Sequence, residues 1–219
     1  MSFGYQLMKN GKLVMAPDFL PYCLNQVIDV APAEGKVVRT SIPNGKPCVV
    51  FFRATSYVAN ASLYFIQRQG SAGYWELEFH YGMAFVDARV YIFSDTLPNI
   101  PDIGFFLYRN GSIVWHGNCL PLSVRPYSDL GGETVFSYPL AVPSCVCNFT
   151  SVGNTVEHWD RWFVFMAGPT SSGQYNVGRA LFSQFNASGP PTTSGFDIPM
   201  NSYIETSVYD TYYKQSLGI

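Results

Sequence analysis

One pattern of apolar and polar positions occurs twice in the chain, in Gly4–Pro21 and again in Gly104–Pro121. In each copy, two apolar-rich runs flank an Asn-Gly pair, Asn10-Gly11 and Asn110-Gly111. Such a pair predicts a β-hairpin, because a two-residue type I′ turn needs positive φ at both positions. The copies align without a gap and share identical residues at Gly4, Leu7, Asn10, Gly11, Val14, Leu20 and Pro21. This recurrence predicts two copies of one β-domain.

Strand-like runs continue through the rest of the chain. Cys48–Phe52 is an unbroken apolar run, which predicts a strand buried on both faces. In Tyr74–His80, the residues Trp75, Leu77 and Phe79 alternate with polar ones, which predicts a strand with one buried face. Turn residues recur about every 8–12 positions, a spacing typical of β-sandwiches. We therefore predict an all-β chain of two tandem antiparallel β-sandwich domains related by internal duplication, with no long helix.

The repeat also predicts the domain boundaries. The first β-sandwich covers residues 1–98, the second covers 99–189, and residues 190–219 form a linker and an extended C-terminal tail. Within the tail, Glu205–Tyr213 is rich in Thr, Val and Tyr, which predicts a strand. A terminal strand after a linker can pair with a sheet edge of its own chain or of a neighbour. The candidate assembly residues of this strand are Val208, Tyr209, Tyr212 and Tyr213.

Composition adds a constraint on the surface. Only 13% of the 219 residues are charged, whereas ordinary globular chains have about 25%. So few charges predict that part of the surface is covered by other subunits. The net charge is −2 and like charges do not cluster, which argues against nucleic-acid binding.

The same residues bear on localisation. The sequence has no apolar stretch long enough for a transmembrane helix and no basic segment followed by an apolar one at its start, so we expect neither membrane insertion nor a secretory signal. An odd number of cysteines, 5, then favours reduced thiols made in a cytoplasm.

Catalytic chemistry has few candidates. His158 and Asp160 are close in sequence, but hydrolytic triads are assembled in space, and a turn with a packed tryptophan explains the pair as well. Glu76 and Glu78 fall on one face of a predicted strand, a spacing compatible with glycoside hydrolysis, although the solvent face of that strand explains them better. We expect no catalytic residues.

The sequence evidence for a metal or cofactor site is equally weak. Cys145-Val-Cys147 and the His116…Cys119 pair contain metal-ligand residue types, but neither has a partner at zinc-site spacing. The sequence also lacks a phosphate-binding loop and a dinucleotide-binding glycine pattern. We therefore expect no metal and no cofactor.

Aromatic residues are the most suggestive binding feature, because Tyr and Trp in loops can stack on sugar faces and form hydrogen bonds. Most aromatics in β-proteins instead belong to the core or to cross-strand pairs. The candidate ligand or partner contacts are Tyr57, Tyr74, Tyr81, Trp159 and Tyr175.

Two segments resemble a known family. The opening Phe3-Gly4-x-Gln6-Leu7 strand with its Asn-Gly hairpin, and the strand Ala88–Phe93 (ARVYIF), are similar to the small β-domain tail-tip and tail-fibre-associated proteins of lambda-like siphophages and related prophages. The resemblance covers chiefly residues 3–15 and 88–93. It implies a bacteriophage virion protein near the tail tip, without enzymatic activity and without catalytic residues to transfer.

These observations lead to one expectation and two alternatives. We expect a structural protein of a tail-tip or tail-fibre apparatus, made in the bacterial host cytoplasm and located in the virion. Its partners would be other phage tail proteins, with several copies in a symmetric assembly that takes part in host attachment. The first alternative is a receptor-binding module that recognises host cell-surface saccharide or pilus. The second is an enzyme acting on cell-envelope polymer, which would need a cleft with a carboxylate pair.

Overall fold

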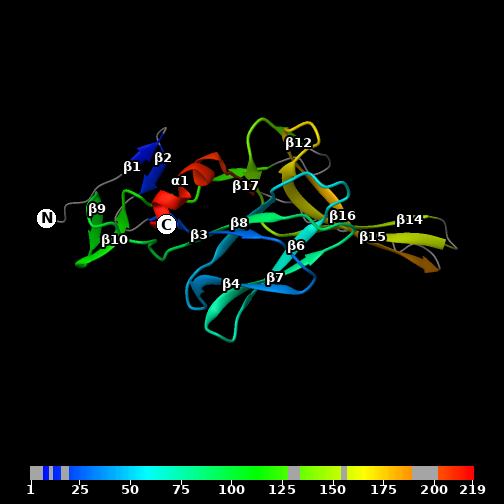
Figure 1. The fold of residues 1–219 in the computed structure, drawn as a ribbon, viewed down its shortest axis with the longest axis horizontal. Helices are drawn as coiled ribbons and strands as arrows, with labels where there is room; N and C mark the ends of the chain where they lie inside the picture. Colours follow the sequence, from blue (N-terminus) through cyan, green and yellow to red (C-terminus); the bar gives the residue numbers. More distant parts are fainter. Residues whose placement is uncertain (1–6, 10–11, 16–19, 128–133, 154–156, 189–201) are drawn as a thin grey trace.

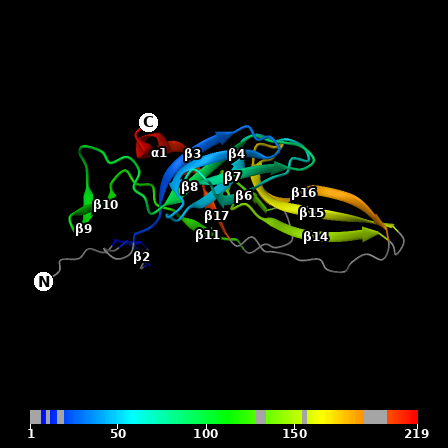
Figure 2. The ribbon, with the colours of Figure 1, turned by 90° about the horizontal axis from the view of Figure 1, so that it is seen from below.

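The structure is a computed structural model that describes residues 7–9, 12–15, 20–127, 134–153, 157–188 and 202–219. It confirms the predicted all-β fold, because nearly every element is an antiparallel strand. The molecule is elongated, with two small hairpins at one end and a long hairpin arm at the other (Figures 1 and 2). Between the ends lie stacked sheets. No described helix is both long and apolar enough to cross a membrane.

Two three-stranded antiparallel sheets form the centre of the molecule. The first has the order β3 (Cys23–Val30), β8 (Ala88–Ser94), β5 (Val49–Ala54), and the second has the order β4 (Lys36–Pro43), β7 (Tyr74–Tyr81), β6 (Leu63–Gln69). Their inner faces meet in one core, where the rings of Phe52 and Phe65 lie 5.5 Å apart, edge to face. The predicted alternation of β7 is confirmed, since Leu77 and Phe79 are fully buried in this core.

The first sheet is buried on both faces. Phe52 points into the core between the sheets, and its neighbour Phe51 belongs to a second apolar cluster on the opposite face. Tyr91 and Phe93 of β8 join that second cluster together with Ile204. The apolar run predicted to be a doubly buried strand is therefore confirmed, and the later part of the chain supplies the second covering layer.

The later strands form two further sheets. One has the order β12 (Thr134–Phe136), β16 (Tyr175–Ser188), β15 (Glu157–Pro169), β14 (Val146–Gly153), and the other has the order β11 (Val124–Pro126), β17 (Ser202–Glu205), β13 (Leu140–Ala141). β15 and β16 pair over their whole length, from Glu157 opposite Ser188 to Pro169 opposite Tyr175. Their distal parts and β14 make the arm seen at one end of Figures 1 and 2.

Both predicted hairpins are present. β1 (Leu7–Lys9) pairs with β2 (Lys12–Met15), and β9 (Phe106–Arg109) pairs with β10 (Ser112–His116), each across a two-residue connection. In the second hairpin, Asn110 has φ 50° and Gly111 has φ 79°, the positive values that the predicted turn requires. The Asn10-Gly11 turn lies outside the described residues.

The two halves of the chain share one core. Phe52 and Val142 exchange backbone hydrogen bonds of 2.8 and 2.9 Å, and Phe165 of the second half packs in the same cluster as Phe52. Strands at corresponding places also differ in pairing, because β8 lies between β3 and β5 whereas β16 lies between β12 and β15. The duplication and the boundaries at residues 98 and 189 stay predictions.

The predicted C-terminal strand is wrong. Strand β17 ends at Glu205, and Val208, Tyr209, Tyr212 and Tyr213 lie in helix α1 (Ser207–Leu217). Tyr209 and Ser216 are buried, and Tyr213 packs against the second apolar cluster, so the inward residues follow helical spacing rather than strand alternation. Gly218, with φ 71°, ends the helix in the left-handed conformation.

The tail packs on its own chain. β17 lies between β11 and β13, and α1 covers the outer face of the first sheet, where Tyr209 contacts Phe93 edge to face at 5.2 Å. Val208 and Tyr212 point outward, 52% and 51% exposed. The described part of the tail therefore pairs and packs within its own chain.

Candidate functional site

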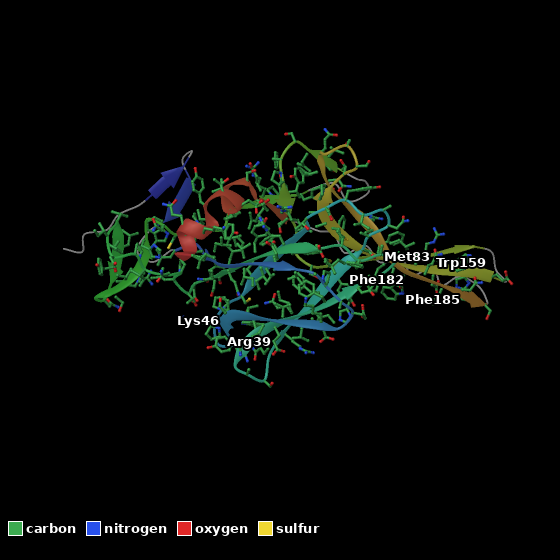
Figure 3. All side chains as sticks on the ribbon, viewed as in Figure 1. Arg39, Lys46, Met83, Trp159, Phe182 and Phe185 are labelled. Carbon is green, nitrogen blue, oxygen red and sulfur yellow. The ribbon has the colours of Figure 1, made fainter. Side chains whose placement is uncertain are left out.

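A groove of about 570 Å³ lies between the loop that joins β5 to β6 and the hairpin of β15 and β16. One wall comes from residues 54–61 of the first half, and the other comes from residues 166–181 of the second half. Met83 also lines it and lies where the arm leaves the body (Figure 3). The groove is therefore built jointly by the two halves.

Small residues leave the space open. Gly168, Gly178 and Ala180 all line the groove from the β15–β16 hairpin. The two walls approach each other closely at Gly168, because a Cβ at this position would lie only 2.8 Å from the Cβ of Ala54. Side chains of ordinary size at these positions would fill the space between the walls.

The rim carries exposed side chains on a loop with defined geometry. Tyr57 and Met83 are 55% and 56% exposed. Asn60 adopts a left-handed φ of 59°, a conformation that asparagine tolerates better than most residues. The next residue, Ala61, forms a β-bridge to Ala84, which ties the loop to the segment that follows β7.

The lining mixes apolar and polar residues and is almost neutral. Amide and hydroxyl side chains are contributed by Ser56, Asn60, Thr170, Ser171 and Asn176. Arg179 is the charged residue of the lining, and the described residues place no carboxylate there. Such a lining can donate and accept hydrogen bonds with a neutral polar ligand.

Of the five aromatic residues predicted as contacts, Tyr57 lines the groove and the other four lie elsewhere. Tyr74 packs under Arg39, whose guanidinium carbon is 5.2 Å from the ring centroid (Figure 3 labels Arg39). Tyr81 contacts Phe85 edge to face at 6.1 Å. These two rings therefore have partners within the chain, as is common in β-proteins.

The remaining two candidates lie on the β15–β16 hairpin. Tyr175 begins β16 and packs against the shared core. Trp159 lies on the distal arm and is 42% exposed, near Phe185, which is 48% exposed (Figure 3). The structure thus does not bring the five predicted residues together in one site.

The sequence did not reveal the other groove residues. Asn60 and Asn176 come from segments 116 positions apart, in turn-rich stretches that resemble ordinary loops. Asn60 and the Ser171-Ser172 pair are residue types common in turns, but they give no indication that the two turns meet. These two segments lie close together because the two halves of the chain pack around a common core.

The glutamates weighed as a catalytic pair lie in a network of ion pairs. Arg68 Nε is 3.5 Å from Glu76, and Arg68 also pairs with Glu78. His80 Nδ1 lies 2.6 Å from Oε1 of Glu34, and this hydrogen bond lowers the pKa of Glu34. The cluster covers the outer face of β7, as the alternation predicted, and it is separate from the groove.

His158 and Asp160 are buried in β15 rather than in a turn. His158 Nε2 lies 3.4 Å from Asp160 Oδ1, and the hydroxyl of Ser151 donates a hydrogen bond of 2.5 Å to the same oxygen. In a hydrolytic triad the serine would bond to the histidine. Here the serine bonds to the aspartate, so the arrangement resembles a structural network more than a nucleophile and its base.

Two buried thiols meet at the base of the second hairpin. Cys23 and Cys119 form a hydrogen bond with each other, which raises the pKa of Cys23 and lowers the pKa of Cys119. Burial raises the pKa of Cys145, while the Cys147 side chain lies outside the described residues. No group of three or more possible ligands is placed to hold a metal ion in the described ranges.

Comparisons with protein-family models, with curated proteins and with solved structures found no match to this chain.

Proposed function

We propose that this chain is a structural virion protein of a bacteriophage tail-tip or tail-fibre apparatus, and that it works by binding rather than by catalysis. It would occur in several copies beside other tail proteins and take part in host attachment. The family resemblance of residues 3–15 and 88–93 supports the proposal, as does the low share of charged residues, 13%. The single observation that carries it is the distribution of exposed apolar side chains.

One group of such side chains gathers at the hairpin end of the molecule. Ile103, Phe105 and Tyr108 are 90%, 63% and 61% exposed, and all lie in or just before β9. Large apolar and aromatic side chains are typical of the buried centre of a protein–protein interface. Burying these side chains against a neighbouring tail protein would remove them from water.

A second group lies at the opposite end, on the arm (Figures 1 and 3). Trp159 pairs with Asn186, and Phe185 pairs with Asp160, so the two aromatic side chains emerge on opposite faces of the ribbon. An extended ribbon with an aromatic residue on each face is suited to insertion between neighbouring subunits. Exposed apolar groups at both ends of a long molecule support a subunit that contacts partners at two places.

The experiment is to tag the chain in its own genome and to ask whether it sediments with phage particles. We expect a fixed amount of the chain per particle. The double variant Ile103→Asp/Phe105→Asp should lower this amount at least severalfold. The matched control is Val208→Asp. Val208 is also an exposed apolar residue, 52% exposed, but it lies on α1, so this variant should be incorporated like the unmodified chain. Absence of the wild-type chain from purified particles overturns the proposal.

A second candidate function is supported by the groove. A receptor-binding module that recognises host cell-surface saccharide or pilus needs a concave polar site with an aromatic side chain, and Tyr57 and the neutral lining are of that kind. Binding of the isolated protein to host cells tests it. Binding only to tail proteins would favour the structural role alone.

A further inference from the structure

We infer that the groove between the β5–β6 loop and the β15–β16 hairpin binds a short, largely neutral oligosaccharide, with the Tyr57 ring as its stacking surface. This inference rests on the second candidate function, receptor recognition, and specifies its site and ligand class. Its basis is the chemistry of the residues that line the groove.

The polar lining matches the hydrogen bonding of sugar hydroxyls. A sugar hydroxyl both donates and accepts, and so do the amides of Asn60 and Asn176 and the hydroxyl of Ser56. These groups come from both walls, so a ligand lying between the walls can bond to each. A buried ligand hydroxyl without such partners would lose its bonds to water without replacement.

Charge separates this ligand class from others. A phosphate-rich ligand such as a nucleic acid requires several cations, and the described lining holds one arginine, Arg179. A divalent cation requires carboxylate oxygens, which the described lining does not supply. A lipid tail requires a lining that is apolar throughout, whereas amides and hydroxyls contribute part of the lining of this groove. A neutral sugar, or one with a single carboxylate, fits the remaining chemistry.

Tyr57 supplies the apolar contact. Its side chain is 55% exposed at the rim and belongs to neither apolar cluster, so the fold does not require it for packing. A tyrosine offers a large rigid surface at a low cost in conformational entropy. The C–H face of a sugar ring can lie on this surface while its hydroxyls reach the amides. The volume of about 570 Å³ falls in the range of about 300–1,000 Å³ found for ligand pockets.

The test measures binding of the full chain to an array of short oligosaccharides, both neutral and uronic-acid-containing, and in parallel to host cells. Tyr57→Ala and Asn176→Ala should each weaken binding to the preferred glycan about tenfold or more, about 1.4 kcal/mol. The matched controls are Tyr212→Ala, a tyrosine 51% exposed on α1, and Asn186→Ala, an exposed asparagine on the same strand as Asn176. Both controls should bind like the unmodified chain. Thermal unfolding of every variant checks that it folds.

The outcomes separate this inference from the function on which it rests. If the chain binds host cells but neither groove variant weakens glycan or cell binding, attachment stands and the groove inference is overturned. If the chain binds neither cells nor any glycan at millimolar concentration, the receptor function and this inference both fail. Capture of a peptide in place of a glycan, with the same dependence on Tyr57, would overturn the ligand class. Should Asn176→Ala fail to fold, the exposed Tyr57→Ala decides alone.

Discussion

The hydroxyl of Tyr91 donates a hydrogen bond of 2.7 Å to Oδ1 of Asp210. This bond joins β8, the central strand of the first sheet, to the C-terminal helix α1. Asp210 also accepts hydrogen bonds from Arg53 at 3.2 Å and from Arg89 at 3.1 Å. Bonds between guanidinium and carboxylate groups are stronger than neutral ones. This carboxylate therefore fixes α1 on the outer face of the sheet, over residues more than one hundred positions earlier in the chain.

Asp210→Ala should detach the helix from the sheet. The variant leaves two partly buried arginines without their shared carboxylate, so we expect a loss of about 2–4 kcal/mol in the free energy of unfolding. Denaturant unfolding measures the loss, and amide hydrogen exchange should show faster exchange within residues 207–217. Gln215→Ala, an exposed change on the same helix, is the control and should alter stability by less than about 0.5 kcal/mol. Unchanged exchange in the helix would contradict this role for Asp210.

Acid should weaken the link between Asp29 and Arg89. Two hydrogen bonds from Arg89, of 2.6 and 2.8 Å, lower the pKa of Asp29 in the folded chain below its ordinary 3.8. A lowered folded pKa means that the pair stabilises the fold above about pH 3.8 and that this contribution is lost as the pH falls through the folded pKa.

Comparing the stability of the unmodified chain with that of Asp29→Asn over a range of pH tests the direction of this pH dependence. At pH 7 the variant should be less stable by about 1 kcal/mol or less, because the Asp29 side chain is 61% exposed. The difference should shrink as unfolding is measured at successively lower pH below 3.8. An equal difference at every pH would show that the charge of Asp29 is not the cause. Asp102→Asn, at an exposed position outside this cluster, controls for a general effect of losing a negative charge.

Local patterns predicted the strands well because each depends on neighbours in sequence. The Asn110-Gly111 hairpin, the alternation of β7 and the doubly buried strand around Phe51 and Phe52 follow from turn geometry and side-chain period. The C-terminal helix could not be predicted from local pattern. The composition around Tyr209 is typical of a strand, and the helix depends on packing against the first sheet, which is distant in sequence.

The candidate site was the least predictable feature. Residue type alone predicts Tyr57 as a contact, but the groove that it lines is completed by Asn176 and Gly168, which lie more than one hundred positions later. Sequence spacing carries no information on contacts of that kind unless the arrangement of the sheets is known. The same limit explains why Tyr74, equally plausible by type, packs under Arg39 of another strand.

The shared core predicts that the halves unfold together. Phe52 of the first half is fully buried and Phe165 of the second is 2% exposed, and both belong to one cluster. Phe52→Ala and Phe165→Ala should each cost about 3–5 kcal/mol, and each should lower a single transition seen alike by far-ultraviolet circular dichroism and tryptophan fluorescence. Two transitions, each shifted by only one of the variants, would instead support independent domains with a boundary near residue 98.

Gly82 should tolerate no side chain, because the arm touches the body at this point. A Cβ at Gly82 would lie 1.9 Å from the backbone oxygen of Phe182 and 2.5 Å from the hydroxyl of Ser62. Figure 3 shows Phe182 at the base of the arm, and its ring also meets Tyr64 edge to face at 4.9 Å. Backbone cannot move aside as a flexible side chain can, so Gly82→Ala must separate the end of β7 from β16.

We expect Gly82→Ala to lower the free energy of unfolding by about 1–3 kcal/mol, the usual cost of overpacking. Gly45→Ala is the matched control, since a Cβ at Gly45 meets no atom within 4 Å, and its stability should change little. Denaturant unfolding of the two variants gives the comparison. The neighbouring Met83 lines the groove, so a shift of the Gly82 backbone should also weaken any ligand bound there, whereas Gly45→Ala should not. Equal stability of the two variants would contradict the close approach of β16 to the end of β7.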